Sequence, residues 1–302
     1  MINIPNNSRV CFVGDSITAN NDYISYVQDY FYKNRNSDGI KFYNCGVSGG
    51  NCVSQLTYFD DDTARHNPTH IFIMLGVNDS WRDRLAEPKS KARYDLLVER
   101  YELFKENLEK LYEKAKSTGA EVILMTPAPY AEFAQMDSPK FNGAYALILG
   151  YAEFVKSFAK DKGCQLVDIH GHLTEKLQTE DIYNPDRVHP TRKGQFYIAE
   201  AILESMGEKI GEFTEMPEYL EVLRDKVAKL RRIYFSELII IGNYGLPLDE
   251  KCKKVRAYLE TPSPAFEIQA KGFLDECQNK EQLYAEIEAN AGRLIPSCQN
   301  VR

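Results

Sequence analysis

Short apolar runs recur at intervals along the first two hundred residues of the chain. Five of them are rich in Val, Ile and Phe and are bounded by Gly, Asn or Pro, which is typical of strands. Because their apolar residues are continuous rather than alternating, we expect each strand to be buried on both faces. The predicted strands cover residues 10–13, 41–45, 71–75, 122–126 and 165–169.

Helical patterns separate these runs. Apolar residues recur at helical spacing over residues 101–115, before Gly119, and over residues 145–159, before Gly163. An alternation of strands and helices predicts an α/β fold with a parallel sheet, right-handed crossovers and helices on both faces. We expect the active cleft at the carboxyl ends of the strands.

The strand signal fades after about residue 207. Five apolar residues then follow one another at spacings of four and three, which predicts a helix carrying Met216, Leu220, Leu223, Val227 and Leu230. Residues 253–259, 265–277 and 281–294 also favour helices. We predict a main domain over residues 1–210 and a helical C-terminal extension over residues 211–302. The apolar stripe could be a coiled-coil seam, but its short length favours packing against the main domain or a second subunit.

Composition narrows the function classes. Of the 302 residues, 43% are hydrophobic and 27% are charged, which excludes wholesale disorder and fibrous architectures. Lys and Arg number 37 against 44 Asp and Glu, a net charge of -7 without any basic run, so we expect no nucleic-acid partner. No apolar stretch approaches the roughly 18 residues of a membrane span, so we expect a soluble protein without one.

The cysteines and the N-terminus favour a cytoplasmic protein. Seven scattered cysteines without CxxC spacing are typical of reduced thiols rather than of disulfides or structural zinc. The first residues lack the basic flank and apolar core of a secretory signal. Asp168, His170 and His172 could hold a metal, but no clear further ligand accompanies them, and we expect neither a metal nor a cofactor.

Two candidate chemical segments follow the first two predicted strands. In the first segment, Gly14, Asp15 and Ser16 end a buried strand and precede a helix expected near Asn20, which exposes a serine at the cleft edge. Asp15 and Ser16 could instead merely cap that helix. The second segment, residues 44–51, holds three glycines whose backbone amides could face an oxyanion or a phosphate, although a plain tight turn is the commoner meaning.

Two further segments complete the set. Asn78 follows the third strand and could donate its side-chain amide to a developing negative oxygen, or could simply form a turn. Asp186 and His189 lie three residues apart in one loop, so the carboxylate can orient the imidazole as a base for a serine. His66 and His70 flank a Pro-containing loop and are expected at the surface.

The four segments together resemble the SGNH, or GDSL, hydrolase family over roughly residues 8–207. The resemblance implies a flavodoxin-like three-layer α/β/α fold with a five-stranded parallel sheet, and a serine esterase without a cofactor. It implies that Ser16 is the nucleophile and that His189 is the base, oriented by Asp186. Gly49 and Asn78, with the Ser16 amide, are implied as the oxyanion hole, with Gly46 and Gly50 as alternatives to Gly49 in the same loop.

The sequence is similar, more loosely, to intracellular carbohydrate acetylesterases such as acetylxylan esterases. The expected substrate is therefore a small acyl ester, acetyl above all, of an alcohol that could be a saccharide. Trp81, Tyr58 and Asp15 are expected to contact it, although Trp81 and Tyr58 could equally serve packing.

Several alternatives stay open. One is a lysophospholipase or thioesterase with a lid over residues 83–93 or 131–145, and others are an acyltransferase and a non-catalytic binding module. Assembly into a homo-oligomer also stays open.

Overall fold

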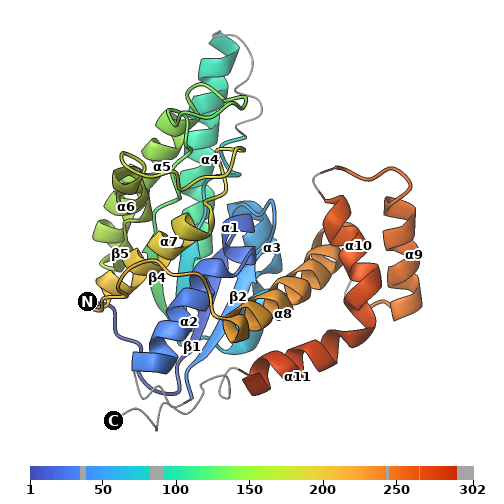
Figure 1. The fold of residues 1–302 in the computed structure, drawn as a ribbon. Helices are drawn as coiled ribbons and strands as arrows, with labels where there is room; N and C mark the ends of the chain where they lie inside the picture. Colours follow the sequence, from blue (N-terminus) through green and yellow to red (C-terminus); the bar gives the residue numbers. More distant parts are fainter. Residues whose placement is uncertain (35–38, 82–90, 243–244, 265, 291–302) are drawn as a thin grey trace.

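A five-stranded, all-parallel sheet forms the centre of the molecule (Figure 1). The computed structural model describes residues 1–34, 39–81, 91–242, 245–264 and 266–290. The strands lie in the order β2-β1-β3-β4-β5, which confirms the predicted α/β class and sheet. Their bounds are β1 Arg9–Gly14, β2 Lys41–Gly46, β3 His70–Met74, β4 Glu121–Met125 and β5 Gln165–Val167.

The continuous apolar character of the strands arises because the sheet has a core on each face. In β1, Val10 and Phe12 belong to one apolar cluster, whereas Cys11 and Val13 belong to the other. This division follows from the two-residue period of a strand. Phe12 stacks on Phe72 of the neighbouring strand with ring centroids 5.0 Å apart. All four β1 residues are fully buried.

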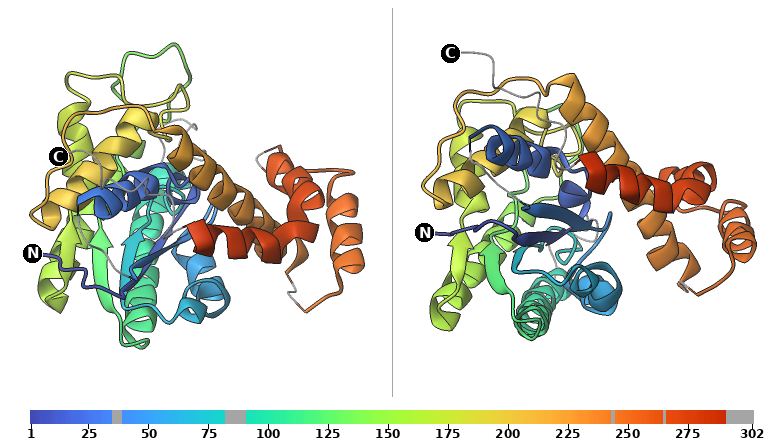
Figure 2. Two further views of the ribbon diagram at one scale, coloured as in Figure 1. Left: turned by 60° about the horizontal axis from the view of Figure 1, so that its bottom comes forward. Right: turned by 90° about the horizontal axis from the view of Figure 1, so that it is seen from below.

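Helices cover both faces of the sheet, as Figure 2 shows from two further directions. One face packs against α2, α6 and α7, and the other against α3, α4 and much of α5. Among the described residues, no helix has both the length and the apolar character needed to cross a membrane. The bounds are α2 Asp22–Asn34, α3 Cys52–Asp62, α4 Lys91–Lys116, α5 Ala144–Lys162, α6 Ile169–Lys176 and α7 Arg192–Ser205.

Two of the differences from the predicted boundaries lie just after β5 and β1. The fifth strand ends at Val167, because the Asp168 side chain accepts a hydrogen bond from the Gly171 amide and thereby caps α6, which begins at Ile169. The helix expected near Asn20 is divided in two. A short helix, α1, covers Ser16–Ala19, and α2 follows from Asp22.

Parallel pairing brings the polar segments after the first three strands to one edge. Gly14 at the end of β1 is in register with Gly46 of β2 and with Met74 of β3. Because β1 lies between these two strands, the segments that follow all three begin side by side. The sheet therefore gathers Ser16, the glycine loop and Asn78 at its carboxyl edge.

Between residues 218 and 290, the described part of the chain is largely helical and packs on the main domain and on itself. Leu220 of α8 joins a core of the sheet, whereas Leu230 and Ile233 join a separate core built by the later helices. The predicted apolar stripe is thus packed within the chain. The elements are α8 Glu218–Phe235, a π-helical turn Ser236–Ile241, α9 Leu248–Tyr258, α10 Glu267–Glu276 and α11 Lys280–Asn290. Figure 1 shows α9 and α10 projecting to one side of the sheet. The domain division at residue 210 stays a prediction.

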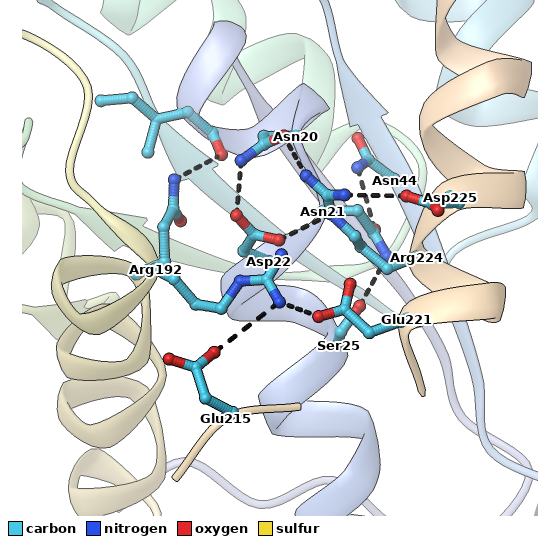
Figure 3. Close-up of polar contacts among 12 residues, drawn as sticks. Asn20, Asn21, Asp22, Ser25, Asn44, Arg192, Glu215, Glu221, Arg224 and Asp225 are labelled. Atoms are coloured by element: carbon cyan, nitrogen blue, oxygen red, sulfur yellow. Dashed lines mark hydrogen bonds and ion pairs between the residues drawn. The ribbon is translucent and has the colours of Figure 1, made fainter. Parts of the chain in front are cut away.

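Polar contacts fix the first half of α8 beside the start of α2 (Figure 3). The Arg224 guanidinium donates to Asp22 Oδ1 over 2.7 Å and to Asn20 Oδ1 over 3.0 Å. Arg192 of α7 forms an ion pair with Glu221, which like Arg224 lies on α8. Burial raises the pKa of Asp22, and the guanidinium of Arg224 opposes this shift by stabilising the charged carboxylate.

A buried ion pair fixes the second half of α8 to the sheet. Arg231 donates to both carboxylate oxygens of Asp62, at 2.7 and 2.6 Å, and to the Gly46 carbonyl at 2.8 Å. The side chains of Arg231 and Asp62 are only 5% and 1% exposed. Removing one partner would leave the other charge buried without compensation, which costs far more than the intact pair contributes.

We therefore expect Arg231→Met to lower the free energy of unfolding by about 3 to 5 kcal/mol. The double variant Arg231→Met/Asp62→Leu should regain much of this loss, because no uncompensated charge remains. Urea unfolding followed by circular dichroism measures both. A loss below about 1 kcal/mol for the single variant, or no recovery in the double variant, would contradict the assigned role of the pair.

Candidate active site

Ser16 is the first residue of α1, directly beyond the end of β1. Asp15 precedes it and is buried, and its carboxylate accepts a hydrogen bond from the Ile17 amide over 2.9 Å. Asp15 therefore caps α1, which was one of the two predicted meanings of this segment. The cap places the Ser16 hydroxyl 2.7 Å from Nε2 of His189, which is 173 positions away in the sequence.

Asp186 and His189 form the other half of this contact. Asp186 Oδ2 lies 2.7 Å from His189 Nδ1, and its Oδ1 accepts from the backbone amides of Val188 and His189 at 2.9 Å each. Partial burial alone would raise the pKa of Asp186, but these hydrogen bonds outweigh it and lower the pKa to about 2. An ionised Asp186 holds the ring proton on Nδ1 and leaves Nε2 free to accept the serine proton.

Arg187, between these two residues, secures their loop. It adopts a φ of 63° and is buried. Its guanidinium donates to four backbone carbonyls, those of Ala131, Ala134, Met136 and Ser138. The predicted lid segment 131–145 is therefore tied to the Asp186–His189 loop at its beginning. Of the other predicted lid, 83–93, residues 83–90 lie outside the described residues.

In the loop that follows β2, one of the three glycines has an uncommitted amide. The Gly46 amide donates to Asn44 Oδ1 over 2.8 Å, and the Gly50 amide donates to the Val47 carbonyl over 2.7 Å. The Gly49 amide has no acceptor among the described residues. Gly49 has a φ of +73°, a conformation that favours glycine. These observations favour Gly49 over the other two glycines as a donor to an external oxygen.

Asn78 and Asp79 connect the third strand to the same loop. Asn78 Nδ2 donates to the Gly50 carbonyl over 2.9 Å, and Asp79 Oδ1 accepts from the Cys52 amide at the start of α3 over 3.1 Å. Burial raises the pKa of Asp79 to about 6, despite the opposing hydrogen bonds from Cys52. No sequence pattern indicated this connecting role of Asp79.

A cleft of about 400 Å³ opens around Ser16 and His189. The main domain contributes mostly small or polar residues to it, including Asn20, Ser48 and Asn184. Its remaining wall comes from the C-terminal extension, a contribution that sequence patterns did not reveal. The extension residues lining the cleft are Ala228, Arg231, Arg232, Ile268 and Gln269.

The three predicted substrate contacts lie elsewhere. Asp15 is buried and caps α1, and its contact with substrate stays a prediction. Tyr58 and Trp81 line a second hollow of about 470 Å³, which shares no lining residue with the cleft at Ser16. The Arg100 guanidinium covers one face of the Trp81 ring at 3.9 Å from its centroid. A substrate contact by Trp81 or Tyr58 stays a prediction, now directed to that second hollow.

The other histidines have structural partners. His70 is not at the surface as predicted, because it belongs to β3 and is buried beside the Thr69 hydroxyl. His66 stacks on Tyr43 with ring centroids 4.0 Å apart, and burial lowers its pKa to about 4. His172 pairs with Glu200 at 2.8 Å. Within the described residues, no group of three or more His, Cys, Asp or Glu side chains could hold a metal ion.

Comparison with known proteins connects this geometry to a sequence family. The model of the GDSL-like Lipase/Acylhydrolase family matches residues 12–195, a span that includes Ser16, Gly49, Asn78, Asp186 and His189. An acetylxylan esterase from Geobacillus stearothermophilus is 27% identical over 223 residues, which cover 68% of this chain and 96% of that protein.

Solved structures show the same fold. A catalytic mutant of Axe2, an acetylxylan esterase from Geobacillus stearothermophilus, has a TM-score of 0.58 at 23% identity and covers 70% of this chain and 100% of its own. BT4096, a gut microbial diltiazem-metabolizing enzyme, has a TM-score of 0.82 at 14% identity, covering 97% of this chain and 96% of its own. The second likeness extends through the C-terminal helices, so their arrangement also has a solved counterpart.

The raised pKa of Asp79 makes its contribution to stability depend on pH. Below the unfolded pKa, near 3.8, Asp79 is neutral in both states; as pH rises through about 6, ionisation increasingly favours the unfolded chain. Asp79→Asn keeps a carbonyl oxygen for the Cys52 amide but cannot ionise. We expect it to gain about 2 kcal/mol relative to wild type between pH 4 and pH 7.

Urea unfolding of both proteins at several pH values measures this gain. An amide group that fits poorly would change the free energy of unfolding by the same amount at every pH. The decisive quantity is therefore how the stability difference between the variant and wild type changes with pH. A stability difference that stays constant from pH 4 to pH 7 would contradict the assigned ionisation.

Proposed function

The chain belongs to the GDSL-like lipase/acylhydrolase family and is a carboxylic ester hydrolase, and we propose that it acts on small acyl esters through Ser16, His189 and Asp186. The observation that carries this proposal is the continuous pair of contacts, 2.7 Å from Ser16 Oγ to His189 Nε2 and 2.7 Å from His189 Nδ1 to Asp186 Oδ2. Such a series is what a serine needs to become a nucleophile near neutral pH.

Acylation begins when Ser16 Oγ attacks the ester carbonyl carbon. His189 Nε2 takes the hydroxyl proton, and Asp186 stabilises the resulting imidazolium. The carbonyl oxygen becomes an oxyanion that accepts from the amides of Ser16 and Gly49 and from Asn78. Ser16 begins α1, so its amide has no acceptor within the helix and can face this oxygen. When the carbon–oxygen bond breaks, His189 returns the proton to the departing alcohol.

Deacylation repeats the same steps with water. His189 Nε2 removes a proton from a water molecule, whose oxygen attacks the acyl carbon of the Ser16 ester. The second tetrahedral oxyanion accepts hydrogen bonds from the same donors. Its collapse releases the carboxylic acid and restores the Ser16 hydroxyl. The low pKa of Asp186 keeps its carboxylate ionised throughout both steps at neutral pH.

The cleft favours a small acyl group and a polar alcohol. A long acyl chain would need an apolar channel, whereas the residues around Ser16 include Asn20, Ser48, Asn184 and Gln269. Such side chains can exchange hydrogen bonds with hydroxyl groups. A relative that carries the name acetylxylan esterase supports the same direction. We propose acetyl or similarly short esters of saccharides as substrates, in preference to lysophospholipids or thioesters.

Ser16→Ala should lower kcat for 4-nitrophenyl acetate by at least about 1,000-fold, because no nucleophile remains. Ser117→Ala, which changes an exposed serine at the end of α4, is the control and should retain wild-type turnover. Circular dichroism and the melting temperature should be unchanged in Ser16→Ala. Wild-type turnover by a correctly folded Ser16→Ala protein would remove Ser16 from the mechanism.

Acyl length separates the proposed substrate class from the lipolytic alternative. Across 4-nitrophenyl acetate, butanoate and octanoate, we expect kcat/KM to fall as the chain lengthens, because the cleft offers few apolar side chains to a long acyl group. The measurement is initial-rate kinetics below micelle-forming concentrations. A preference for octanoate over acetate would instead support a lipolytic enzyme.

A further inference from the structure

We propose that Arg232, contributed by the C-terminal extension, binds a carboxylate on the alcohol portion of the ester, so that esters of carboxylate-bearing alcohols are the preferred substrate class. This inference rests on the proposed function of Ser16 and specifies the substrate of the same site. Arg232 lies in the last turn of α8 and lines the cleft together with Ser16 and His189. It is the cleft's strongest candidate for selecting among esters.

Arg232 has no counter-charge of its own. Within the described part of the chain, no carboxylate lies within 4.0 Å of its guanidinium, and no side-chain hydrogen bond engages it. The other charged residues of the cleft are all engaged, Arg231 by Asp62 and Asp186 by His189. A guanidinium presents a planar set of donors that matches a carboxylate with two parallel hydrogen bonds.

Consecutive positions on α8 give Arg231 and Arg232 different roles. Successive residues of a helix point about 100° apart. Arg231 therefore reaches Asp62 at the end of α3 and Gly46 at the end of β2, whereas Arg232 runs toward α10. Because Arg231 is fixed on one side, and Arg224 two turns earlier is fixed by Asp22, the direction of Arg232 is set by the anchoring of the whole helix.

Gly272 of α10 provides the space that Arg232 occupies. A Cβ atom placed at Gly272 would lie 2.9 Å from Arg232 Nε and 3.0 Å from its Cδ, too close for an ordinary contact. Glycine inside a helix is less favourable than alanine. The contact with Gly272 restricts the aliphatic part of the Arg232 side chain, so the side chain loses less conformational entropy when a ligand binds.

The extension also brings two apolar side chains, Phe266 and Ile268, to the region of the site. A Cβ atom at Gly49 would lie 3.3 Å from the ring of Phe266, which places that ring against the loop of the proposed oxyanion hole. Ile268, which is 73% exposed, lines the same cleft. An alcohol portion bound in this cleft can contact Ile268 as well as Arg232, because both residues line it.

Matched pairs of esters test this proposal. The probes are 3- and 4-acetoxybenzoate, which carry a carboxylate, and 3- and 4-acetoxybenzamide, which have the same shape without charge. For at least one isomer, we expect Arg232→Gln to lower kcat/KM for the benzoate by about 10- to 100-fold and to leave the benzamide within about twofold of wild type. Comparing each variant with wild type on the same ester cancels the intrinsic reactivity of the leaving groups.

Two further variants separate direct binding from other effects. Arg232→Lys keeps the charge but loses the planar donors, so kcat/KM for the benzoate should fall less than it does with Arg232→Gln. Lys229→Gln removes a cation from the same helix. Lys229 pairs with Glu276 at 3.3 Å, so its loss should leave kcat/KM for both the benzoates and the benzamides unchanged. If Arg232→Gln lowers kcat/KM equally for both esters of each pair, or lowers it for neither benzoate, the proposal is overturned.

Failure of the proposed function would look different. In that case, wild type would hydrolyse neither 4-nitrophenyl acetate nor any of the four probes at a rate that Ser16→Ala abolishes. If wild type hydrolyses 4-nitrophenyl acetate and the benzamides but not the benzoates, the esterase proposal stands and the role of Arg232 is refuted.

Discussion

The hydrogen bond between Ser16 Oγ and His189 Nε2 is the contact on which the rest of the site depends. It joins the end of the first strand to a loop 173 residues later, and both sides are held independently. Asp15 fixes Ser16 by capping α1, and the paired oxygens of Asp186 fix the ring and backbone of His189. Arg187 then ties that loop to the segment beginning at Ala131. An error of even 1 Å in this alignment would weaken proton transfer.

The C-terminal extension has a part in the site as well as in the packing of the chain. Its first helix is anchored by Arg224 at Asp22 and by Arg231 at Asp62, two ion pairs on the main domain. These anchors place the next residues of the extension along the cleft. In the proposed mechanism, the reacting side chains come from the sheet domain, whereas the extension lines part of the cleft that would receive the alcohol portion.

The sequence predicted the parts of the fold that depend on local pattern. Continuous apolar runs located the strands, and the family resemblance named Ser16, Asp186 and His189, which the structure brings together. Contacts between distant side chains could not be read from the sequence. Arg187 and Arg231 act through partners more than 45 positions away, and neither lies in a pattern that specifies its partner. The extension's contribution to the cleft was hidden because helical periodicity indicates which residues are apolar, not which surface they meet.

Covalent labelling with a fluorophosphonate tests the central claim most directly. An activated serine attacks phosphorus, fluoride departs, and the serine oxygen remains bonded to the phosphonyl group. Peptide mass mapping of the labelled native protein should locate that group on Ser16, with labelling lost when His189 is replaced by alanine. A folded protein that stays unlabelled, or that carries the label on another residue, would contradict the account.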